Sequence, residues 1–164
     1  MNILALAVAA LIPLLVGFVW YSDKVFGKAW QNAAGLKTED LEGANMAVIF
    51  GGTLVLSFLL AVAVQFGVVH QMHIGSLLAS DPDFADTSSE LYQWYQGFMA
   101  DHGSKHRTFG HGVFHGIFLA VMLALPVIAI NALFERKGIK YVALHAGYWI
   151  LTIALMGGVV SAWQ

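Results

Sequence analysis

The chain has no cysteine, only three prolines and few charged side chains. The absence of cysteine excludes a disulfide-stabilised secreted scaffold and a zinc site built from thiolates. Charged residues make up 11 % of the 164 residues, whereas an ordinary soluble domain has about 25 %. So few charges cannot cover the surface of a soluble fold of this size. The net charge of −2 gives no electrostatic basis for binding nucleic acid.

Apolar residues make up 59 % of the chain, and they fall into four uncharged stretches. A helix that crosses a bilayer needs about 20 consecutive apolar residues. We therefore expect membrane-spanning helices over about 2–22, 46–69, 109–134 and 141–163. The predicted fold class is all-α, an integral membrane four-helix bundle that forms a single domain over 1–164. No basic residue precedes the first apolar run, so we read it as a retained helix rather than a cleaved signal peptide.

Lysine and arginine are unevenly distributed among the loops. The loops after the first and third expected spans hold six of them, and the loop after the second span holds only Lys105 and Arg107. Basic residues in short loops favour the cytoplasmic side. This predicts cytoplasmic first and third loops, with both termini and the long second loop outside.

Small residues and prolines mark places where helices pack or bend. Gly112 and Gly116 form one small-xxx-small step, and Ala143 and Gly147 form another. Such steps allow two helix backbones to approach closely, within the bundle or between copies of the chain. Pro13 and Pro126 fall inside spans, where each is expected to kink its helix or to leave a carbonyl facing a ligand.

The long second loop contains a predicted amphipathic helix over about 88–101. Thr87 and Glu90 match the pattern of a capping box at its start. An apolar stripe follows with helical spacing. It consists of Leu91, Trp94, Tyr95, Phe98 and Met99. The helix either lies flat at the outer membrane surface or covers the mouth of the bundle as a lid.

Six of the seven histidines are expected at the outer side of the membrane. Two pairs, at i,i+3 and i,i+4 spacing, are predicted to share a helix face at matching depth on consecutive spans. They are His70 with His73, and His111 with His115; His102 and His106 are possible extra ligands. Imidazole binds zinc and copper, and a histidine from each of two helices can also clamp a haem iron. Amphipathic histidines at a membrane surface satisfied by hydrogen bonds are the alternative.

The seventh histidine, His145, lies near the cytoplasmic start of the last span. An ionisable group inside a span usually faces the bundle interior and finds a partner there. Asn131 and Glu135 are the nearest candidates across the short third loop. A structural hydrogen bond is expected, with proton transfer as the alternative.

Two stretches carry a resemblance to a known family. One is GFVWYS at 17–22, followed by FGKAW at 26–30 and Gly35-Leu36; the other runs from Leu125 to Trp163 and includes NALFERKG and HAGYW. Together they resemble the bacterial membrane proteins catalogued as domain of unknown function 1761. The pattern leads us to expect asparagine where this chain has His145. The residues that carry the resemblance are expected on the cytoplasmic face: Trp20, Tyr21, Trp30, Asn131, Phe134, Glu135, Arg136 and Tyr148.

The resemblance implies a small four-helix inner-membrane protein and no particular activity. The sequence shows no nucleophile motif, carboxylate pair or phosphate loop, so an enzyme is not favoured. The first functional expectation is an accessory subunit of a larger membrane complex or a self-associating scaffold, in contact with the lipid bilayer. The second is a metal- or haem-binding membrane protein that uses the outer histidines, with zinc, copper or haem as cofactor.

Overall fold

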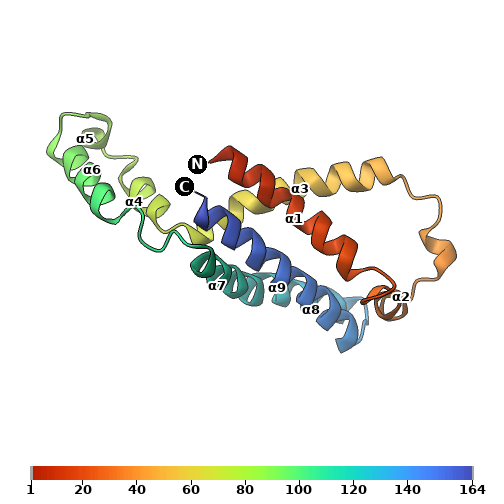
Figure 1. The fold of residues 1–164 in the computed structure, drawn as a ribbon. Coiled ribbons are helices and arrows are strands. Elements are labelled where there is room, and N and C mark those ends of the chain that lie inside the picture. Colours follow the sequence, from red (N-terminus) through yellow and green to blue (C-terminus); the bar gives the residue numbers. More distant parts are fainter. Residues whose placement is uncertain (1, 164) are drawn as a thin grey trace.

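The computed structural model describes residues 2–163, and these residues form helices and no strands. Four long apolar helices make up the body of the molecule (Figure 1). They are α1 (Ile3–Trp20), α3 (Met46–Val68), the continuous run Phe109–Phe134 and α9 (Ile139–Ala162). Each is long and apolar enough to cross a membrane, which indicates a membrane protein. The predicted all-helical fold class with four long apolar helices is confirmed.

Shorter helices fill the connections between the long ones. The first connection contains α2 (Gly27–Ala34) and the 3₁₀ turn η1 (Thr38–Leu41). The second contains α4 (Gln71–Leu78), α5 (Pro82–Ala85) and α6 (Glu90–His102), which together we call the arm. Figure 1 shows the arm extending beyond the end of the body where both chain termini lie, which we call the arm end. The opposite end, where α2 lies, is called the α2 end.

Capping side chains define where three of the long helices begin. Asn2 accepts a hydrogen bond from the backbone N–H of Ala5, and Asn45 accepts one from Val48, each at 3.2 Å. Thr108 accepts one from His111 at 3.3 Å. Each cap satisfies a backbone donor that has no partner within its helix.

The last helix, α9, lies at the centre of the packing. In its most apolar stretch, 56 % of the residues are buried inside the protein, whereas the corresponding share in the other three long helices is 28 % or less. It contacts α1, α3 and α7 (Phe109–Leu119). Gly112 and Gly116 on α7 lie directly against the backbone of α9 near Ile153 and Gly157. The absence of side chains at these glycines therefore lets the two helices approach closely.

The second small-residue step does not form such a contact. Ala143 is exposed, and a Cβ atom at Gly147 would lie 3.0 Å from the indole ring of Trp20. Gly147 therefore makes room for one aromatic side chain of α1, rather than for the backbone of a second helix.

The two prolines have different surroundings. Pro13 is buried within α1, and its carbonyl oxygen accepts a hydrogen bond from the Tyr148 hydroxyl at 2.9 Å. Pro126 follows a π-helical turn, η2 (Ala120–Ala124), in which the N–H of Leu125 donates to the carbonyl of Ala120 five residues earlier. This turn separates α7 from α8 (Leu125–Phe134), and its wider hydrogen-bond spacing lets the helix continue past the proline.

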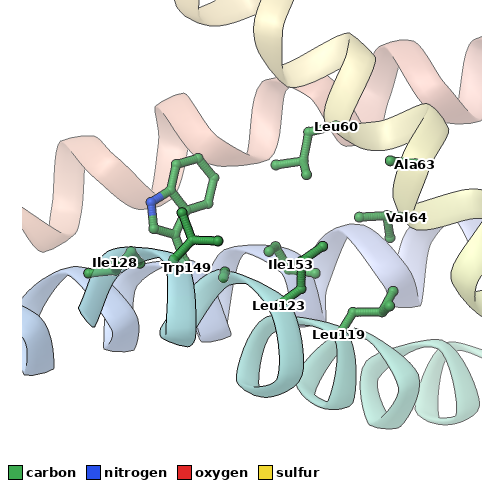
Figure 2. Close-up of a pocket in the computed structure, with 10 residues that line it drawn as sticks. Leu60, Ala63, Val64, Leu119, Leu123, Ile128, Trp149 and Ile153 are labelled. Atoms are coloured by element: carbon green, nitrogen blue, oxygen red, sulfur yellow. The ribbon is translucent and has the colours of Figure 1, made fainter. Parts of the chain in front are cut away.

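A cavity of about 300 Å³ lies beside the π turn, between α3 and the α7–α8 run, with α9 as its floor. Figure 2 shows Leu60 and Val64 of α3 facing Leu119 and Leu123 across it. Its lining is almost wholly hydrocarbon.

The arm differs from expectation at its start. Ser89, not Thr87, caps α6, because the Ser89 hydroxyl accepts from the N–H of Tyr92 at 3.0 Å. Part of the apolar stripe packs within the arm itself, where the ring of Phe84 on α5 contacts Tyr92 and Tyr95.

Candidate metal centre

The candidate centre lies at the arm end of the body, where α3 stops and α7 begins. Val68 and Val69 are almost fully buried, which anchors the last residues of α3 in the core. Val69 has an extended backbone (φ −103°, ψ 91°), so the chain turns away from the helix axis there. His70 is the next residue and is exposed at the turn, immediately before α4.

The other two histidines come from the first turns of α7. His111 and His115 are four residues apart and therefore lie one above the other on the helix. The neighbouring face, with Gly112 and Gly116, is buried against α9. This contact fixes the rotation of α7 and leaves both histidines half-buried on the side facing the end of α3.

Arg107 holds the segment before α7 in place. Its guanidinium donates to the carbonyl oxygens of Ser161 at 2.7 Å and Trp163 at 2.9 Å, and to that of Val160 at 3.4 Å. These carbonyls lie at the end of α9, where helical carbonyls have no partner within the helix and a cation is favourable. Partial burial lowers the pKa of Arg107 from its ordinary value. Nothing in the sequence around Arg107 had indicated this anchoring role.

Three histidines converge at this place. One ligand nitrogen each from His70, His111 and His115 lies within 4.8 Å of the other two. The Nε2 atoms of His70 and His111 are 3.0 Å apart, within hydrogen-bond distance, so one ring donates and the other accepts. The ring centroids of His111 and His115 are 4.4 Å apart.

The surroundings favour the neutral imidazole that a metal requires. The pKa of His70 is lowered from its ordinary value, first because the ring is partly desolvated. Repulsion from the other histidines, His115, His106 and His73, when they are protonated lowers it further. The nitrogen lone pairs are therefore available near neutral pH.

His106 lies next to the three converging histidines. Its ring stacks on that of His111, with centroids 4.8 Å apart and an interplanar angle of 29°. The backbone of His106 has a φ of 63°, a left-handed conformation that non-glycine residues adopt uncommonly. The carbonyl oxygen accepts hydrogen bonds from the backbone of Thr108 and the hydroxyl of Ser161. His106 is thus the extra ligand candidate that the structure places beside the cluster.

The structure places His73 and His102 differently from the sequence expectation. His70 and His73 do not share a face of the second span, because that helix ends at Val68 and His73 belongs to α4. His102 is the last residue of α6, where its ring packs on Phe98. Neither belongs to the group of converging ligand atoms.

The arrangement suits a single transition-metal ion. Zinc with imidazole nitrogens at about 2.0–2.1 Å in tetrahedral geometry separates its ligand atoms by roughly 3.3 Å. The His70 and His111 nitrogens already lie 3.0 Å apart. Three protein ligands also leave a fourth position for His106, water or another ligand. A haem is a poorer fit, because two axial histidines must lie on opposite faces of a porphyrin and cannot contact each other directly.

One family model matches residues 4–161 of the chain, and its description is "Protein of unknown function (DUF1761)". The chain belongs to this family. No curated protein and no solved structure matches it. The resemblance inferred from the two sequence motifs is therefore confirmed over nearly the whole chain.

Most of the residues that carry the DUF1761 resemblance form one aromatic group and one exposed turn at the α2 end, whereas Trp20 contacts Phe26 and lies against Gly147. The Tyr21 ring contacts the rings of Trp30 and Tyr148, with centroids 5.3 and 5.2 Å apart. Asn131, Phe134, Glu135 and Arg136 are exposed at the end of α8. Lys137 joins this turn to α2, because its Nζ donates to the carbonyl of Ala34.

His145 has a partner that the sequence reasoning missed. Its Nδ1 lies 3.2 Å from the hydroxyl of Tyr21. The two expected partners, Asn131 and Glu135, are both exposed, and the charge of Glu135 still acts on the ring. Tyr21 and His145 are 124 positions apart, so only the packing of α1 on α9 brings them together. In the sequence, a tyrosine at the end of the first apolar run was the feature that could have indicated a hydrogen-bond partner for His145.

Proposed function

We propose that this DUF1761 protein binds one transition-metal ion, of the zinc or copper class, through His70, His111 and His115. The observation that supports this is the convergence of one nitrogen from each ring within 4.8 Å. The three residues come from the end of one span and the start of the next, which are held by buried valines and by the close contact between α7 and α9. Imidazole is a common ligand for both metals.

The membrane position of the site is part of the same proposal. The lysine and arginine distribution favours an arrangement in which the arm end faces away from the cytoplasm of a bacterial inner membrane. The metal site would then lie at the outer surface, accessible to ions in that compartment.

The test compares metal binding by matched histidine variants. Purified wild-type protein, His111→Ala and His73→Ala are stripped with chelator, loaded with zinc or copper and assayed for bound metal. We expect about one ion per chain in wild type and in His73→Ala, and loss of most binding in His111→Ala, because His73 lies outside the cluster. At a hundredfold excess of metal over its dissociation constant, binding adds about 2.7 kcal/mol to the stability of the folded state.

Two results would contradict the metal proposal. One is wild-type protein that retains no metal after loading. The other is an equal loss in His73→Ala and His111→Ala, which would mean that scattered surface histidines bind the ion. Thermal unfolding of the three metal-free proteins verifies that His111→Ala is still folded.

A second candidate function is self-association or membership of a larger membrane complex. The observation that favours it is the apolar cavity between α3 and the α7–α8 run, which opens between two lipid-facing helices (Figure 2). Leu123 on its rim is 66 % exposed and provides apolar surface for a helix of another chain. Native mass measurement after gentle detergent extraction tests this candidate, and a lone monomer without any retained partner counts against it.

A further inference from the structure

A second, larger cavity lies at the other end of the molecule. It measures about 610 Å³ and is formed by the last turns of α1, the first turns of α3 and one residue of α9. Figure 1 shows α1 and α3 diverging toward this α2 end. The volume falls within the range of about 300–1,000 Å³ that is usual for small-molecule sites.

The rim of this cavity is apolar and faces outward. Phe18 is 84 % exposed and Phe50 is 51 % exposed, and Ile49 lies beside them. All three belong to helices that are long and apolar enough to span the membrane. A ligand that reaches this cavity from the side therefore passes through hydrocarbon, so it must itself be lipid-soluble.

The inner part of the cavity contains hydroxyl groups, which distinguishes it from the cavity in Figure 2. Tyr148 donates its hydroxyl hydrogen to the carbonyl of Pro13 at 2.9 Å. The Tyr21 hydroxyl lies 3.2 Å from Nδ1 of His145. The direction of this second hydrogen bond determines what the cavity offers to a ligand.

The surroundings of the second ring nitrogen of His145 decide the direction of this hydrogen bond. The other ring nitrogen of His145, Nε2, is buried and has no hydrogen-bond partner. If Tyr21 donated to Nδ1, a neutral His145 would carry its hydrogen on Nε2 and would bury an unpaired N–H group. The favoured tautomer has Nδ1–H donating to the Tyr21 oxygen, because an orphaned buried N–H is rarer than an unpaired acceptor. The Tyr21 hydroxyl hydrogen is then free to point into the cavity.

We propose that this cavity binds a lipid-soluble quinone, with the Tyr21 hydroxyl donating a hydrogen bond to a ring carbonyl. The ring lies beside Tyr21 and Tyr148 in the inner part of the cavity, and the apolar tail leaves past Phe18 and Phe50 at the rim into the bilayer. The residues that line the cavity include no lysine or arginine. A phospholipid would bring a phosphate group without a cationic partner, so a neutral carbonyl head matches the lining better.

The experiment measures quinone binding in phosphatidylcholine nanodiscs. Decylubiquinone is titrated into wild-type protein, and quenching of tryptophan fluorescence is recorded, since the rings of Trp30 and Trp149 contact the cavity-lining Tyr21 and Tyr148. Tyr21→Phe removes only the hydroxyl, and Tyr92→Phe on α6 makes the same change outside the cavity. We expect saturable quenching in wild type, about tenfold weaker binding in Tyr21→Phe and no change in Tyr92→Phe.

A second variant distinguishes a loss of quinone binding from a loss of folding. Ile49→Phe narrows the cavity from its half-exposed rim, adds no tryptophan to the fluorescence signal and keeps the Tyr21–His145 contact. It is expected to abolish saturable quenching while the melting temperature stays within a few degrees of wild type. Non-saturable quenching in wild type, or equal affinity in Tyr21→Phe, overturns the proposal. Retention of a phospholipid that decylubiquinone cannot displace, detected by native mass spectrometry, also overturns it in favour of a lipid occupant.

Discussion

The contact between α7 and α9 allows a quantitative test of the packing. A Cβ atom at Gly116 would lie 2.5 Å from the carbonyl oxygen of Ile153 and 2.8 Å from the Cα atom of Ala154. Ordinary contact of this kind begins at 3.4 Å, so Gly116→Ala must separate the two helices locally by roughly 0.9 Å. The neighbouring atoms are backbone, which cannot rotate away as a flexible side chain would.

The expected effect of Gly116→Ala is a loss of about 1–3 kcal/mol in the free energy of unfolding, as for other overpacked interiors. For a chain of this size, each kcal/mol lowers the melting temperature by about 2–4 °C. The measurement is thermal unfolding in mild detergent, followed by helical circular dichroism.

Gly51→Ala is the matched control. Gly51 lies inside α3, and an added Cβ atom would meet nothing within 4 Å. Alanine is favoured over glycine in a helix interior by up to about 1 kcal/mol, so this variant should be as stable as wild type or more so. Our account of the α7–α9 contact is wrong if Gly116→Ala melts at or above the wild-type temperature, or if both variants lose the same stability.

Three further predictions concern the arm end and the sidedness of the chain. Arg107→Lys should lower the free energy of unfolding by about 1–2 kcal/mol, because an ammonium group cannot reach all three carbonyls at the end of α9. Faster hydrogen exchange of the backbone amides at 159–163 would show that the lost stability is local to this helix end. The lowered pKa of His70 has no effect on the stability of the metal-free fold above about pH 6.5, where the ring is neutral in both states. It destabilises the fold as pH falls from there toward the lowered folded-state value, because the unfolded chain binds the proton first. The melting temperature should therefore drop between pH 7 and pH 5, and less so in His70→Gln; an equal drop in both would contradict this. In intact spheroplasts, added protease should cleave the arm and leave 35–45 untouched, whereas the reverse would invert the proposed orientation.

Much of the fold follows from where the chain lacks charge. Uncharged runs of sufficient length must be helical in a membrane because their backbone groups cannot bond to water there. Asn45 and Thr108, which cap α3 and α7, are residue types that favour the N-cap position, but the expected helix boundaries rest on the apolar runs and not on this signal. The central position of α9 could not be predicted from the sequence, because a helix that is apolar all round does not indicate which faces are buried. The π turn at Ala120–Ala124 likewise depends on how the chain accommodates Pro126 within its packing.

The candidate sites show the same limit. His111 and His115 share a face through helical periodicity alone, and the antiparallel order of consecutive spans placed His70 near them. His73 could not be placed, because the break at Val69 is a local backbone choice, and Gly67 two residues earlier still belongs to α3 and does not mark it. The Tyr21–His145 contact joins residues at opposite ends of the chain and required the three-dimensional packing.

The contact between His70 and His111 has a consequence for how the chain tolerates change. The chain leaves the body at His70 and returns beside it at His111, with Gln71 donating to the carbonyl of Lys105 near the same place. The two ends of the segment that contains the arm therefore lie close together. Doubling the length of such a loop costs only about 0.6 kcal/mol of closure entropy. The arm is therefore the segment where insertion, deletion or replacement by a short turn, or fusion of a reporter domain, should leave the register of the four long helices intact.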